Sequence, residues 1–147
     1  MVNNFLYAEP FAKSGKMERL LAAVGAAFVL AGSTVVWYFD PTKAGFFPVC
    51  PLFSMTGLAC PGCGLTRGFH ALFHGDLLTA IDYNALIPVF VIIFGLLFVS
   101  LVMVAARGRG FLKLNQSPKV IVGFFVLLMV FGVLRNLPVY PFTFLYP

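Results

Sequence analysis

All three cysteines of the chain lie in one short stretch, where they can act together on a metal ion or a disulfide. They are Cys50, Cys60 and Cys63, and the last two enclose a Pro-Gly pair. A Cys-x-x-Cys turn followed by glycine brings two sulfurs to the same side of a tight turn, and Gly64 permits the backbone conformation that such a turn often needs. This arrangement suits a metal knuckle. It also suits a dithiol at a helix N-terminus, where the dipole stabilises a thiolate on Cys60.

Three interpretations of these cysteines stay open. In the first they are structural and hold an outer loop, which an oxidising compartment permits, although the odd number leaves one thiol unpaired. In the second they bind zinc, and His70 is the nearest fourth ligand, seven residues or about 10 Å of helical rise beyond Cys63. In the third they carry out thiol–disulfide exchange. Cys60 attacks a disulfide as a thiolate, and Cys63 or Cys50 then resolves the mixed disulfide. That would be a membrane thiol–disulfide oxidoreductase with a quinone or a partner protein as electron acceptor.

Two arginines beside apolar segments are further candidate site residues. Arg67 follows the cysteine turn, and Arg135 follows the last apolar run. A guanidinium in such a place pairs with a carboxylate or a lipid phosphate, or reaches the interface along its own side chain. Asp76 and Asp82 are possible partners, and an anion or lipid-headgroup site is the functional alternative.

The composition excludes an ordinary soluble domain. Hydrophobic residues make up 61% of the 147 residues and charged residues 10%, whereas soluble proteins carry about 25% charged residues. The net charge of +5 does not indicate nucleic-acid binding, because the basic residues flank apolar runs and form no long patch. Much of the surface should therefore face lipid.

Three apolar windows predict membrane-spanning helices at about residues 20–39, 85–106 and 119–135. The first ends in Trp37 and Tyr38, as an interfacial aromatic belt would, and it is too long for the apolar part of a cleaved signal peptide. The third window is short. It becomes long enough if Lys119 and Arg135 extend to the two interfaces.

The basic residues predict the orientation of these helices. Seven lie on the side of the N-terminus and of the loop between the second and third windows: Lys13, Lys16, Arg19, Arg107, Arg109, Lys113 and Lys119. Three lie on the other side: Lys43, Arg67 and Arg135. Since basic loops stay in the cytoplasm, we expect a cytoplasmic N-terminus, with residues 40–84 and the C-terminus outside.

The outer segment, residues 40–84, has its own predicted organisation. Residues 44–63 are rich in Gly, Pro, Phe and Cys, which indicates irregular backbone at the membrane face. Residues 65–74 form an amphipathic pattern, with Leu65, Phe69, Leu72 and Phe73 on one face and Thr66, His70 and His74 on another. Gly75 should end this interfacial helix, and Asp76 should cap a second short one.

Several of these residues occur in a recognisable order. The pattern resembles the bacterial membrane family DUF2752, a domain of unknown function, and the matching residues are Cys50, Thr56-Gly57, Cys60-Pro61-Gly62-Cys63-Gly64-Leu65-Thr66-Arg67, Gly75-Asp76, Asn84, Arg135-Asn136-Leu137-Pro138 and Tyr140-Pro141. The resemblance covers roughly residues 50–147. One departure is Ala85, where the family tends to have proline. The resemblance implies a bacterial membrane protein and supplies no activity.

We therefore predict an all-α membrane protein with three transmembrane helices and one or two interfacial helices, in a single membrane domain over residues 1–147. The expected location is the bacterial cytoplasmic membrane. The default function is structural or accessory, with a non-enzyme favoured, and zinc binding and thiol oxidoreduction are the alternatives. The expected partners are the lipid bilayer and other membrane proteins, without nucleic acid.

Overall fold

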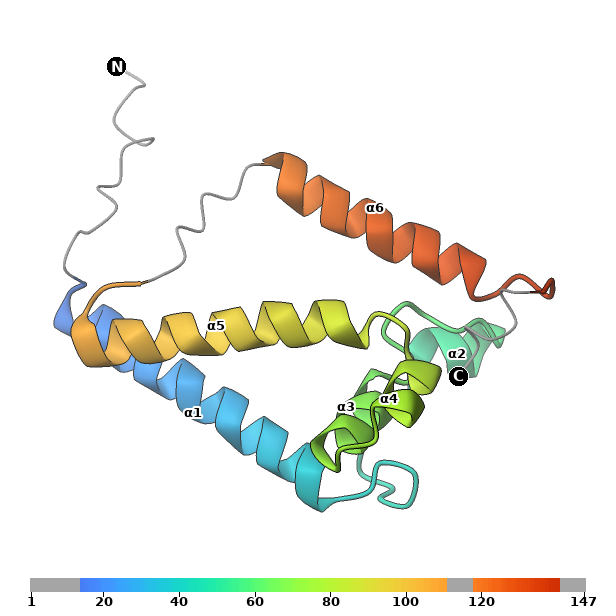
Figure 1. The fold of residues 1–147 in the computed structure, drawn as a ribbon, viewed down its shortest axis with the longest axis horizontal. Coiled ribbons are helices and arrows are strands. Elements are labelled where there is room, and N and C mark those ends of the chain that lie inside the picture. The colour runs from blue at the N-terminus through green and yellow to red at the C-terminus, as the bar shows by residue number, and fades with distance from the viewer. Residues whose placement is uncertain (1–13, 111–117, 141–147) are drawn as a thin grey trace. The chain divides into compact units, whose positions relative to one another are not determined.

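The computed structural model describes residues 14–110 and 118–140, and every regular element in those ranges is a helix (Figure 1). In chain order the helices are α1 (Lys16–Tyr38), α2 (Pro51–Thr56), α3 (Leu65–Phe73), α4 (Leu77–Tyr83), α5 (Ile87–Arg107) and α6 (Pro118–Leu134). The all-helical class predicted from the sequence is confirmed. Lys13, Lys113 and Pro141, on which parts of the orientation and family arguments rest, lie outside the described residues.

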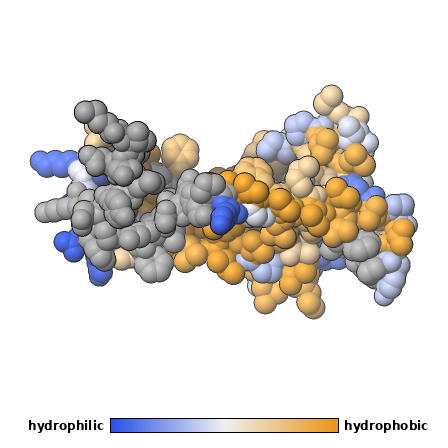
Figure 2. All heavy atoms as spheres, turned by 90° about the horizontal axis from the view of Figure 1, so that it is seen from above, coloured by the Kyte–Doolittle hydropathy of each residue, from blue (hydrophilic) through white to orange (hydrophobic). Residues whose placement is uncertain are grey.

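Two of the described helices, α1 and α5, are long and apolar enough to cross a membrane. They contain 23 and 21 residues, which correspond to about 34 and 31 Å, against about 30 Å of hydrocarbon in a bilayer. Their side chains are largely exposed: Phe28 on α1 and Ile92 on α5 leave 76% and 61% of their surface open. Apolar residues also dominate the described surface in Figure 2. Such surfaces need lipid or protein to cover them.

The third apolar helix, α6, has 17 residues and a length of about 26 Å, which is short for a span. Apart from Lys119, its described side chains are apolar and mostly exposed, including Val120, Phe125 and Met129. The sequence analysis extended this helix by letting Arg135 reach the interface. That expectation is wrong, because the Arg135 side chain is buried, with 1% of its surface exposed.

Contacts divide the chain into two units, and the first contains the described parts of residues 1–32 and 92–115. There the start of α1 is joined to the end of α5. The Ser14 N–H donates to the Gly108 carbonyl at 2.8 Å, and the Arg19 guanidinium donates to the carbonyls of Ala105 and Ala106 at 3.1 and 2.8 Å. These bonds satisfy carbonyls that the last turn of a helix leaves without partners.

The second unit contains residues 33–91 and the described part of 116–147. Its core lies where α3 meets α4 and the start of α5, around Ala71, Ala80 and Ile87. Leu65, Phe69 and Leu72 pack against this core, which confirms three of the four residues of the predicted apolar face; the fourth, Phe73, is 40% exposed.

The boundary between α3 and α4 follows the predicted local signals. Gly75 adopts a φ of +84°, which L side chains rarely adopt, and Asp76 accepts a hydrogen bond from the Thr79 N–H at 3.0 Å. Glycine thus ends one helix and aspartate caps the next, as the sequence analysis expected.

Helix α2 corrects the prediction that residues 44–63 form only irregular backbone. Pro51 occupies the first turn of the helix, where its missing N–H costs nothing, and Gly57 ends it with a φ of +72°. Both signals were present in the sequence. A six-residue helix is simply too short to show a periodic apolar pattern.

Candidate functional site: a cluster of three cysteines

The three cysteine sulfurs lie together in the second unit. The Sγ atoms of Cys50, Cys60 and Cys63 are all within 4.8 Å of one another, and those of Cys60 and Cys63 are 3.1 Å apart. All three side chains are partly buried free thiols. Thiolates around a tetrahedral zinc stand about 3.8 Å apart, so small side-chain movements would suit these atoms to one ion. Cys50 therefore lies beside the Cys60–Cys63 turn, as a site made of all three cysteines requires.

The turn that carries two of these sulfurs forms from local sequence. The Cys63 N–H donates to the Cys60 carbonyl at 3.0 Å, and the Leu65 N–H donates to the Gly62 carbonyl at 3.1 Å. Gly64 then adopts a φ of +81° and α3 begins at the next residue. In addition, the Cys60 N–H points at the Cys63 sulfur at 3.2 Å. This confirms the glycine-dependent turn that the spacing predicts.

The environments of the sulfurs differ electrostatically. Hydrogen bonding from the backbone N–H of Phe53, in the first turn of α2, and then from the Cys60 thiol lowers the pKa of Cys50 to about 7. Burial, followed by the thiols of Cys60 and Cys50, raises the pKa of Cys63 to about 12. Cys50 directly precedes α2, so the N–H groups of the first turn of that helix stabilise its thiolate.

A buried asparagine holds the turn from one side. Asn84 has none of its surface exposed. Its Nδ2 donates to the carbonyls of Pro61 and Cys63 at 2.9 and 3.1 Å, and its Oδ1 accepts from the Leu86 N–H at 2.9 Å. Both ends of the amide are therefore used, which is what a buried polar group requires. The start of α5 and the cysteine turn are fixed to each other by this one side chain.

The residues that follow α6 hold the same turn from another side. Arg135 donates through Nη1 to the carbonyls of Cys60 and Cys63 at 2.8 and 3.1 Å, and its guanidinium carbon lies 5.2 Å from the ring centre of Phe131. Asn136 exchanges two hydrogen bonds of 2.8 Å with the backbone of Ala59. The turn is thus held by side chains 75 and 77 residues further along the chain.

The other predicted site residues lie elsewhere. His70 does not join the sulfur cluster, and its Nδ1 is 2.7 Å from the Val36 carbonyl. Arg67 is exposed, and its role in headgroup binding stays a prediction. Arg135 does not fit the predicted headgroup site, because its side chain is buried and bonded to carbonyls of the turn.

Residues 50–98 match a known family. That family is DUF2752, described as a protein of unknown function. The resemblance predicted from the sequence is confirmed for this segment, and residues 99–147, which the prediction also included, lie outside the match. No curated protein and no solved structure matches the chain.

The matched segment, residues 50–98, contains all three cysteines and Asn84, whereas Arg135 and Asn136 lie beyond it. The sequence analysis noted Asn84 and Asn136 only as parts of the family pattern and assigned them no role, and it placed Arg135 at a lipid headgroup or at the membrane interface. Their position in the sequence was a usable signal. Asn84 comes just before the apolar helix α5, and Arg135 and Asn136 come just after the apolar helix α6. A polar side chain at either end of such a helix can bond to backbone groups of a neighbouring loop.

Proposed function

We propose that this protein is a multi-pass membrane protein that binds a thiophilic metal ion, with zinc as the first candidate, through Cys50, Cys60 and Cys63. The observation that carries the proposal is the approach of the three sulfurs to within 4.8 Å of one another. Three thiolates are a soft donor set, which selects Zn²⁺ or Cu⁺ over hard cations. The fourth position is left to water, a partner side chain or an exogenous ligand.

Charge and preorganisation support metal binding at this cluster. Three thiolates and Zn²⁺ carry a net charge of about −1, and the buried guanidinium of Arg135, bonded to the carbonyls of Cys60 and Cys63, supplies a positive charge close by. Because Asn84 and Arg135 fix the turn before any ion arrives, little ordering remains to be done when it binds.

Metal analysis of purified protein, combined with a count of free thiols, tests this proposal. We expect about one zinc per chain, sulfur-to-cobalt charge-transfer absorption after exchange with Co²⁺, and loss of both in Cys50→Ser, Cys60→Ser and Cys63→Ser. Ser54→Ala, on the exposed α2, is the matched control and should bind as the parent does. A parent protein with three reactive thiols and no affinity for Zn²⁺ or Co²⁺ would refute the proposal.

Thiol–disulfide exchange is the second candidate, favoured by the pKa of Cys50 near 7 and the 3.1 Å between the other two sulfurs. If Cys60 and Cys63 form a disulfide, the Cys50 thiolate attacks one of its sulfurs, a new S–S bond forms, and the other sulfur leaves as a thiolate. Forming the first disulfide needs an acceptor of two electrons and two protons, such as a quinone. A reducible disulfide in metal-free protein, with turnover of a disulfide substrate, would favour this candidate.

We further propose that α6 is a third span, in addition to α1 and α5. The argument starts at the cysteine turn, which bonds Asn84 just before α5 and Asn136 just after α6. If α5 crosses the bilayer, the chain must cross again to bring Asn136 back to the turn. Local thinning of the bilayer would accommodate the 17 residues of α6.

The orientation in a bacterial cytoplasmic membrane is tested with single cysteines in a background lacking the native ones. A cysteine at Lys43 should react with an impermeant thiol reagent in intact cells, and one at Gln116 should resist it, because the seven-to-three basic asymmetry keeps the latter inside. Labelling at Gln116 from outside would contradict this topology. The partners are then lipid and other membrane proteins. If the purified protein contains no metal and its thiols are inert, a purely structural or accessory role is favoured.

A further inference from the structure

The chain contains two histidines, and both stand at the end of α3, away from the sulfur cluster. His70 and His74 are four residues apart, so their side chains emerge on the same face of the helix. Their ring centres are 4.4 Å apart and the ring planes are inclined by 41°. The pair is partly open, with His70 half-buried and His74 exposed.

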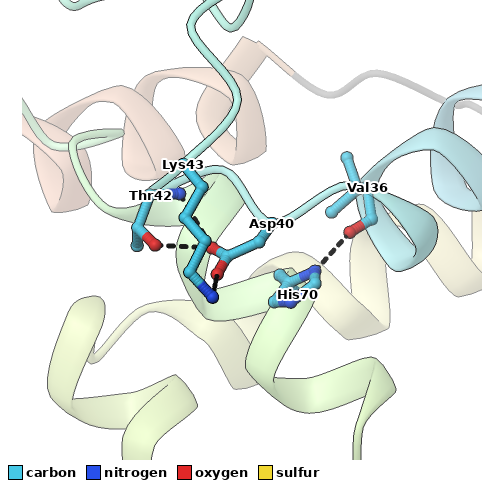
Figure 3. Close-up of polar contacts among 5 residues, drawn as sticks. All are labelled: Val36, Asp40, Thr42, Lys43 and His70. Carbon is cyan, nitrogen blue, oxygen red and sulfur yellow. Dashed lines mark hydrogen bonds and ion pairs between the residues drawn. The ribbon is translucent and has the colours of Figure 1, made fainter.

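Both rings are held by backbone carbonyls in the same way. His70 Nδ1 lies 2.7 Å from the Val36 carbonyl, as Figure 3 shows, and His74 Nδ1 lies 2.8 Å from the His70 carbonyl. A carbonyl oxygen only accepts, so each Nδ1 must carry the hydrogen. In the neutral ring Nε2 then has a free lone pair. This is the arrangement that orients metal-binding histidines, whose other nitrogen donates to a carbonyl or carboxylate.

The separation of the rings suits one shared ion. An imidazole nitrogen binds a divalent transition metal at about 2.0–2.1 Å, which puts the ring centre about 3.2 Å from the ion. Two such rings at adjacent coordination positions stand roughly 4.5–5 Å apart, close to the observed 4.4 Å. The bonded carbonyls belong to the last turns of α1 and α3, and the partial negative charge at helix C-termini favours a cation.

We infer that His70 and His74 form a second metal site, which binds a borderline divalent cation such as Cu²⁺ or Ni²⁺ through the two Nε2 atoms. Imidazole suits these ions, whereas the cysteines suit softer ones. The remaining coordination positions are open to water or to a ligand from outside. This inference does not rest on the cysteine cluster.

The single tryptophan of the chain provides a built-in reporter of this site. Trp37 stacks on His74 with ring centres 6.3 Å apart and an interplanar angle of 15°. A Cu²⁺ ion on the His74 ring would therefore lie within about 10 Å of the indole and quench its fluorescence. Electron paramagnetic resonance of the bound Cu²⁺ is also simple to assign, because any imidazole bound to the ion must come from His70 or His74.

The experiment uses untagged full-length protein whose thiols are blocked with methyl methanethiosulfonate, titrated with CuCl₂. We expect saturable quenching of Trp37 at one ion per chain, with two imidazole nitrogens coupled to Cu²⁺ in electron paramagnetic resonance. His70→Asn and His74→Asn should each weaken binding about tenfold or more. Asparagine keeps a side-chain N–H near the position of Nδ1 and removes Nε2, so it would rescue a purely structural role but not metal binding.

Three results would overturn the inference. One is binding of Cu²⁺ with a single coupled imidazole, another is unchanged affinity in either asparagine variant, and the third is no saturable quenching. Circular dichroism of the variants shows whether α3 remains folded. His70→Ala and His74→Ala, which also remove the N–H donor, separate loss of the carbonyl bond from loss of the ligand.

Discussion

Two arginines in different parts of the molecule make nearly the same hydrogen bonds in different surroundings. In the first unit, Arg19 donates to the carbonyls of Ala105 and Ala106 at the end of α5. In the second, Arg135 donates to the carbonyls of Cys60 and Cys63. Arg19 is partly exposed, whereas Arg135 leaves 1% of its surface open. Each guanidinium satisfies two carbonyls that a helix or sheet does not satisfy.

The difference in burial changes what each arginine contributes. Water can replace the hydrogen bonds that Arg19 donates, since the end of α5 near Ala106 and Arg107 is exposed. The Arg135 guanidinium is shielded from water, so water does not readily replace its two part-buried hydrogen bonds. Arg19 therefore adds modestly to the contact between two helices, while Arg135 contributes more to holding the cysteine turn, together with Asn84 and Asn136.

Replacing each arginine by methionine tests this comparison directly and should give the largest effect. Arg135→Met should lower the free energy of unfolding by about 3 kcal/mol, because the part-buried carbonyls of Cys60 and Cys63 lose a charged donor and each keeps one other hydrogen bond. Arg19→Met should cost about 1 kcal/mol or less. Unfolding of purified protein in mixed micelles with increasing dodecyl sulfate measures both. An equal loss of unfolding free energy in the two variants would show that burial does not make Arg135 more important for stability than Arg19.

The same pair of variants also separates a role in folding from a role in metal binding. Arg135→Met should weaken Co²⁺ binding at the cysteines under conditions where the protein is still folded, whereas Arg19→Met should leave it unchanged. Arg135→Lys keeps the charge but loses the planar double donor, so it should fall between the parent and the methionine variant.

Two helical glycines, one in each unit, allow the closeness of packing in the two units to be compared. A Cβ on Gly68 would lie 2.7 Å from Ile87 Cδ1 and 3.0 Å from the Ala80 carbonyl, whereas one on Gly25 would lie 3.5 Å from the nearest atoms, the methyl groups of Leu101. Gly68→Ala should therefore destabilise the protein by about 2 kcal/mol through overpacking. Gly25→Ala should be neutral or stabilising by up to about 1 kcal/mol, since alanine favours helix. A neutral Gly68→Ala would mean that α3 and α4 are less closely packed than described.

Within the cysteine cluster, hydrogen bonding at Cys50 and burial at Cys63 shift the pKa values of two identical groups in opposite directions. In metal-free protein, alkylation of Cys50 by iodoacetamide should rise steeply as the pH increases through about 7, because its hydrogen bonds favour the thiolate. Cys63, whose pKa burial raises to about 12, should stay protonated and unreactive over the same range. Mass spectrometry of peptides from each pH measures both rates. Equal reactivity of the two thiols at pH 8 would contradict the contrast.

The sequence by itself determined the features that depend on neighbouring residues. Uncharged apolar runs predicted α1 and α5 with bounds within a few residues, because a helix of that length satisfies its own backbone. Gly64, Gly75 and Asp76 predicted where α3 begins and ends, because a positive φ and a helix cap are local requirements.

Only the tertiary structure decided which polar residues serve the cysteine site. It buried Arg135 beneath the turn, gave Asn84 and Asn136 their backbone partners, and bonded His70 to the Val36 carbonyl. These contacts join residues 21 to 77 positions apart, and no local pattern records such a separation. A side chain at the end of an apolar helix can face water, lipid or a neighbouring loop. The choice follows from which unsatisfied backbone groups the fold brings within its reach.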